Sequence, residues 1–259
     1  MTPRSARPRV ACLGSVRRGP VLAALACAVL RGALAWYFRG MGQGGALLLS
    51  MGGGAVVPGL IGSFEPFAMV LTIAPDLLLC YLLADFMPAR LSSDATTLLP
   101  RTDSRASWAA RSCGRLVLLV CLHEAASCAV VLAMAPQALN ALLLCALLSA
   151  ALLSALVLLV NLVALRRDAV VGFAVVVGAH VAVLLALSAA PSSLARGLAP
   201  WLPSARGVPA WHDAVCALAG LSPEAAASMR PEVSLALLLL LSALALCLIA
   251  RTVRRADLL

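Results

Sequence analysis

The sequence predicts an all-α membrane protein with about six transmembrane helices. Hydrophobic residues make up 63% of the chain, charged residues only 12%, and the mean hydropathy is +1.01. A typical soluble domain is about 45–50% apolar and about 25% charged. Apolar runs of about 18 residues recur along the chain, which is the length that crosses a bilayer as a helix. No run alternates with period two and aromatic residues are few, so a β-barrel is not favoured.

Six apolar segments are the candidate spans, and each is long enough to cross a hydrocarbon core of about 30 Å at about 1.5 Å per residue. They cover residues 21–38, 66–86, 116–135, 138–165, 169–189 and 233–250. The remainder divides into a cytoplasmic coupling segment at 88–115 and two external loops, 39–65 and 190–232. We therefore expect residues 1–259 to form a single transmembrane domain.

The arginines predict the orientation. All 20 basic residues are Arg; fifteen flank the spans on one predicted side, four lie on the other, and Arg31 lies inside the first span. The positive-inside rule then places both termini in the cytoplasm and the protein in the cell membrane as a multi-pass protein. Because the arginines gather beside apolar runs, we expect a lipid bilayer and no nucleic acid as partner.

The two external segments differ in character. Residues 40–63 are apolar and glycine-rich, so they are a candidate re-entrant or interfacial segment. Residues 191–231 are too polar and too rich in proline to span. We expect Trp201 and Trp211 at the headgroup level and a short surface helix at 215–221. Cys216 has no evident partner in this loop, so we predict no structural disulfide.

Ionisable side chains inside the predicted spans are candidates for function. A charge at bilayer depth costs about 2.5–3.5 kcal/mol on insertion scales, so such residues face protein or water and find partners. We expect Arg31 to pair with Asp76 or Glu124. One interpretation is a polar pathway or proton relay, and the other is an ion pair that fixes helix packing. The set is Arg31, Asp76, His123, Glu124 and His180.

The polar segment before the third span is the candidate docking site. Asp103 or Ser104 is a suitable N-cap, so a helix is expected to begin there. A face with a tryptophan between arginines suits a protein partner, while the alternative is anchoring at the membrane surface. The residues expected on that face, at intervals of three and four, are Arg105, Trp108, Ser112 and Arg115.

Three other patterns do not support an enzyme. His123-Glu124 begins a zinc-protease motif, but Ser127 replaces the second histidine. Residues 40–45 match GxGxxG without a βαβ context, and GxxxxGK[ST] is missing. We expect no catalytic residue, metal or cofactor in this chain, so ATP hydrolysis would need another polypeptide.

Two stretches resemble a family of ABC-2-like exporter permeases of Gram-positive bacteria. They are 76–86, a hydrophobic helix, and 98–108, a cytoplasmic turn of the type TR-x-x-SR-x-x-W. Pro100 stands where the family often has Thr, and Arg115 where a Lys is common. The end of the chain, 255–259, resembles the family tail R-x-D-[IL]-L. The family positions in the turn are filled by Arg101, Ser104, Arg105 and Trp108.

The resemblance implies a permease subunit of an ATP-binding-cassette exporter. Its partners would be a separate ABC ATPase subunit, docked on the turn and on Arg115, and a second copy or a related permease subunit. The residues alone leave one alternative open, an ion- or proton-coupled transporter or channel that uses the intramembrane charges. In that alternative, neutral substitutions at Asp76 and Glu124 would abolish transport and Arg105→Ala would matter little. In an exporter, the order of the two effects would be reversed.

Overall fold

The computed structural model describes residues 19–41, 47, 49–51, 66–94, 105–134, 139–220 and 227–255. These residues form helices and no strand. Six helices are long and apolar enough to cross a membrane, so the predicted all-α, six-span architecture is confirmed and the chain is a multi-pass membrane protein. The long helices are α1 (Gly19–Tyr37), α3 (Pro66–Leu82), α5 (Arg105–Met134), α6 (Leu139–Ala164), α7 (Ala169–Ala189) and α11 (Pro231–Arg255). The span that contains α3 runs on through α4 (Phe86–Asp94).

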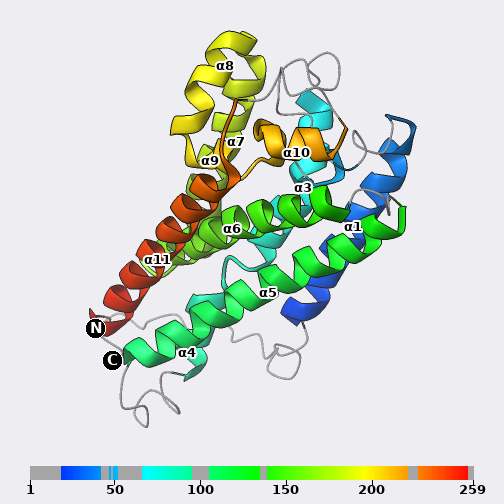
Figure 1. The fold of residues 1–259 in the computed structure, drawn as a ribbon. Helices are drawn as coiled ribbons and strands as arrows, with labels where there is room; N and C mark the ends of the chain where they lie inside the picture. The colour runs from blue at the N-terminus through cyan, green and yellow to red at the C-terminus, as the bar shows by residue number, and fades with distance from the viewer. Residues whose placement is uncertain are drawn as a thin grey trace, which may run out of the picture.

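Helix α6 is the centre of the bundle (Figure 1). Its leucines and alanines occur on every face, which suits a helix surrounded by others. It packs against α5, α7 and α11, and also contacts α3 and α4. Helix α1 instead packs on α5 and α3. One buried cluster includes Leu142 near the start of α6, and a second includes Leu158 near its end.

Helix α5 is longer than the predicted third span. It begins at Arg105 and continues unbroken for 30 residues, about 45 Å at about 1.5 Å per residue. The hydrocarbon core is only about 30 Å thick, so the first turns of α5 extend beyond it. The described part of the predicted coupling segment is therefore helix α4 and the beginning of α5. The expected helix start next to Ser104 agrees with this boundary.

A side chain from α6 stabilises the break between α3 and α4. The amide of Asn161 donates to the carbonyl oxygen of Leu83 at 2.9 Å and accepts from the backbone N–H of Met87 at 2.9 Å. It also donates to Val157 within its own helix at 2.9 Å. Asn161 is fully buried, so these bonds satisfy backbone groups that water cannot reach. Helix α4 is thereby fixed to α6.

The second predicted external loop folds back into the bundle. It contains α8 (Ser192–Leu198), η5 (Ala199–Trp201), α9 (Pro203–Arg206), η6 (Pro209–Trp211) and α10 (Asp213–Leu218), which together we call the cap. Between α9 and η6, Gly207 lies so close to Leu152 that a Cβ at this position would overlap its side chain. Because Leu152 lies midway along α6, the cap reaches the middle of that helix.

The cap corrects two predictions. Trp201 is 81% exposed, but Trp211 is fully buried in the core, so it does not lie at a headgroup interface. The predicted short helix exists as α10, but its residues Val215 and Cys216 are buried rather than at the surface. Packing against α6, α7 and α11 accounts for both differences. Most of the predicted re-entrant segment, 40–63, lies outside the described residues.

Candidate functional site

Three helices bring four ionisable residues together in the interior, and we call this set the charge cluster. Arg31 of α1 is fully buried and is its centre. Its Nη1 donates to Oε2 of Glu124 on α5 at 2.7 Å, and its Nη2 forms an ion pair with Asp76 of α3. The expected pairing of Arg31 is confirmed for both carboxylates. His123 of α5 completes the set.

The local sequence allows this approach. Gly32 follows Arg31, and a Cβ at Gly32 would overlap the side chain of Val130, so α1 lies in close contact with α5. Pro75 precedes Asp76 inside α3. A proline there removes one helical hydrogen bond and tends to kink the helix at that point. Asp76 therefore lies directly after the proline, within α3, and pairs with Arg31 of α1.

His123 bridges two of these helices. Its Nδ1 lies 3.1 Å from the carbonyl oxygen of Ala24 on α1, and a carbonyl only accepts, so Nδ1 carries a proton. Its Nε2 lies 3.4 Å from Oδ1 of Asp76 without forming an aligned hydrogen bond. Oε1 of Glu124 and Nε of Arg31 also lack a hydrogen-bond partner among the described residues. The cluster is ion-paired but not fully satisfied.

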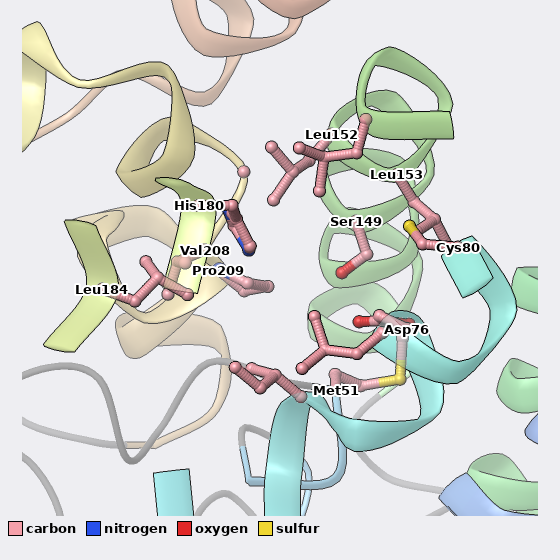
Figure 2. A pocket seen from close by; sticks show the side chains of 14 residues that line it. Met51, Asp76, Cys80, Ser149, Leu152, Leu153, His180, Leu184, Val208 and Pro209 are labelled. Atoms are coloured by element: carbon pink, nitrogen blue, oxygen red, sulfur yellow. The ribbon is translucent and has the colours of Figure 1, made fainter. Parts of the chain in front are cut away.

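A small cavity adjoins the cluster on the side of Asp76 (Figure 2). The space open to the centre of a water molecule is about 30 Å³, room for one or two waters. His180 of α7 lies across the cavity from Ser149 and Asp76, and Val208 and Pro209 of the cap close one side. Nδ1 of His180 is buried and has no partner among the described residues. The cavity is therefore polar enough to be hydrated.

The cluster does not fit a metal site. Asp76, His123 and Glu124 each offer a ligand atom, and these atoms lie within 4.8 Å of one another. However, the guanidinium of Arg31 already bonds both carboxylates. A second cation among these groups would be repelled by Arg31 and would have to displace it. The position of Arg31 between the two carboxylates is therefore the reason to expect no metal ion in the cluster.

The predicted docking face is formed only in part. Arg105 and Arg115 are exposed, as expected, while Arg101 and Ser104 lie outside the described residues. Trp108 is only 3% exposed and belongs to the same buried cluster as Met87 of α4, so its prediction as an exposed anchor is wrong. The face of α5 that contains Trp108 and Ser112 packs inward, and the arginines lie on its two flanks.

Exposed arginines nevertheless gather where α4 and α5 begin and where α6 and α11 end (Figure 1). We call this the basic end. Asp85 and Asp168 are the described exposed acidic residues there. This is the end that the positive-inside rule predicts to face the cytoplasm. The exposed arginines are Arg105, Arg111, Arg115, Arg166, Arg167, Arg251, Arg254 and Arg255, and Arg90 of α4 is half-buried.

Two polar groups of structural importance were not predicted. For Asn161, the signal in the sequence is a single amide that interrupts the apolar run 155–165. His212 in the cap is fully buried; its Nδ1 lies 3.2 Å from the carbonyl oxygen of Val208, and its Nε2 lies 3.0 Å from Oγ of Ser234 on α11. The sequence around His212 is a proline-rich loop, and nothing in that local pattern predicts the contact with Ser234 on α11.

Comparison with models of protein families, with curated proteins and with solved structures gives no match.

Proposed function

We propose that this protein is the membrane-spanning permease subunit of an ATP-binding-cassette exporter and that a separate ATPase subunit binds its basic end. One observation carries the proposal. Helix α4 shares a buried cluster with the first turns of α5, which extend beyond the hydrocarbon core. A soluble motor needs a firm contact that continues into the membrane helices. Helix α4 is bonded to α6 through Asn161, and it shares a buried cluster with Trp108 of α5.

The route of coupling follows from these contacts. A movement imposed on α4 or on the first turns of α5 would be passed to α6, because both helices pack on α6. Rocking of α5 and α1 against α6 and α7 would then open the bundle alternately to its two sides. A second copy or a related permease subunit would complete the transport path.

The proposal is tested by affinity purification of the tagged protein in mild detergent. We expect the wild type to bring down a polypeptide with nucleotide-binding motifs and ATPase activity. Arg105→Glu/Arg111→Glu, which reverses two exposed charges at the basic end, should reduce its recovery at least tenfold. The matched control is Arg196→Glu, an exposed arginine in the cap. If wild type and both variants recover no ATPase under several mild conditions, the exporter proposal fails.

A second candidate is favoured by the charge cluster. An ion- or proton-coupled transporter needs titratable groups inside the membrane that are joined to a hydrated space. The charge cluster provides the titratable groups, and the cavity at His180 provides a space with room for water. The cluster alone also suits a purely structural ion pair that fixes α1, α3 and α5.

The two candidates predict opposite rankings of variants. If an ion gradient drives transport, Asp76→Asn and Glu124→Gln should abolish it in proteoliposomes without ATP, and Arg105→Glu should leave it unchanged. If an ATPase drives transport, Arg105→Glu should be the more damaging change. A collapsed proton gradient separates them further, because only the coupled transporter would stop when ATP is still supplied.

A further inference from the structure

The charge cluster carries an unbalanced negative charge in the absence of an added proton. Arg31 contributes one positive charge, Asp76 and Glu124 one negative charge each, and neutral His123 none, so the net charge is −1. Arg31 is fully buried and Glu124 is only 3% exposed. An unpaired charge in such surroundings costs several kcal/mol, and one bound proton removes it.

The hydrogen bonds of His123 indicate where that proton is bound. Its Nδ1 must donate, because its partner is the carbonyl oxygen of Ala24. In the neutral ring, Nε2 would then present a lone pair to Oδ1 of Asp76 at 3.4 Å, which is repulsive. A proton on Nε2 turns this contact into an attraction between imidazolium and carboxylate. The charge balance calls for one proton, which Glu124 or His123 could hold, and the contact between Nε2 and Oδ1 of Asp76 favours His123.

We infer that the charge cluster is a proton-binding site that holds one exchangeable proton on Nε2 of His123. One N–H bond forms, with a proton from water, and no other covalent bond changes. Among the described residues, the other titratable groups around the site are Cys27 on α1, Cys80 on α3, Cys128 on α5, Cys145 on α6 and His180 on α7. The thiols are uncharged in apolar surroundings, so they do not alter the charge balance.

The cavity offers this proton a neighbouring site where a water can be held. Asp76 keeps 21% of its side chain open, whereas Arg31 keeps none, so Asp76 is the accessible member of the cluster. The cavity has room for one or two waters between Asp76, Ser149 and the unpartnered Nδ1 of His180. A water bonded to Asp76 can exchange a proton with the site, and His180 can relay it. The inference holds whichever energy source drives transport.

The test is ¹⁵N NMR of histidine-labelled protein in lipid nanodiscs at pH 7. The chain has 3 histidines, and His180→Gln and His212→Gln assign their signals. We expect His123 to be an imidazolium in the wild type. Glu124→Gln makes the cluster neutral without the proton, so His123 should become neutral at the same pH. The matched control is Glu232→Gln, an exposed acidic residue on α11, which should leave His123 charged.

Two results would overturn the inference. One is a neutral His123 in the wild type at pH 7. The other is a His123 that stays charged in folded Glu124→Gln protein, since charge balance would then not hold the proton. The wild type alone gives a further check that does not depend on a variant folding. An alkaline titration should remove the imidazolium signal reversibly in a single one-proton step, and Ser149→Leu, which fills the cavity, should slow that step severalfold after a pH jump.

Discussion

Gly207 of the cap lies against Leu152 at the middle of α6, with no room for a Cβ between them. Through this contact an irregular segment reaches deep into the helical bundle. Backbone groups at such depth must be bonded within the protein. Here the N–H of Val208 donates to Ala205 at 3.0 Å, and the N–H of Trp211 donates to Val208 at 3.3 Å. Pro209 has no N–H that would need a partner.

Gly207→Ala should loosen the cap. The added methyl group would overlap Leu152, and overpacking of this kind costs about 1–3 kcal/mol. We expect a lower thermal midpoint in detergent and faster proteolysis within 192–219. Gly197→Ala is the matched control, because a Cβ there meets nothing within 4 Å. Equal behaviour of the two variants would show that the cap does not depend on this close approach.

Asn161→Leu should release α4 from the bundle. The substitution removes three hydrogen bonds of 2.9 Å. It leaves the buried N–H of Met87 without its acceptor, while the carbonyl oxygen of Leu83 keeps its bond from the N–H of Phe86 at 3.2 Å. A buried donor left unsatisfied costs about 1–3 kcal/mol. Hydrogen exchange at residues 83–90 should therefore rise well above that in the control Asn140→Ala, since Asn140 is exposed. Unchanged exchange at these amides would contradict the assigned role.

His212 should make the cap sensitive to acid. Burial lowers the pKa of His212. Its hydrogen bonds to the carbonyl oxygens of Pro209 and Val208 raise the pKa by a smaller amount, so the net change is downward. Arg206 lowers this pKa further and Asp213 raises it. The unfolded chain then binds more protons than the folded one below the ordinary value of about 6.5, so stability falls as pH drops through that value. Protease resistance of the cap should decrease between pH 7 and pH 5 in the wild type but not in His212→Gln. The same decrease in both proteins would assign the effect elsewhere.

Arg31→Met should be more damaging than removal of the whole ion-pair network. The single change leaves Asp76 and Glu124 beside each other without the guanidinium that bonds both, and breaking a buried pair costs about 3–5 kcal/mol. The triple variant Arg31→Met/Asp76→Asn/Glu124→Gln carries no such charge and should recover most of the loss in thermal stability. Folding yield and melting in detergent measure both. A triple variant as unstable as the single one would mean that the network stabilises the bundle through geometry rather than charge.

The helices could be predicted from hydropathy because a membrane span depends on length and apolar composition alone. Helix α7 has the predicted bounds, and Asp168 caps it by accepting from the N–H of Val171 at 2.8 Å. The pairing of Arg31 was predictable because an isolated charge at this depth is too costly to leave unpaired. That argument names the kinds of partner, but only the packing of α1, α3 and α5 shows that both carboxylates contact one guanidinium.

Other features depend on surfaces that are far away in the sequence. The composition of the cap is that of a water-exposed loop, yet Trp211 is buried because its segment packs on α6, in one cluster with Leu142 and Leu184. The helical period correctly grouped Trp108 with Ser112, but periodicity does not tell which face turns inward. The position of His180 beside Asp76 likewise requires α3 and α7 to be neighbours, which a single span cannot reveal.

The unbroken length of α5 has a mechanical consequence. Arg111, at the basic end, and Glu124, in the charge cluster, lie on the same rod about 20 Å apart, with regular helix between them. Among the described residues of α5 there is no proline, and the helix runs from Arg105 to Met134 without a break. A tilt of its outer end would therefore also move Glu124 and His123. The surface at the basic end and the charge cluster are parts of one continuous helix.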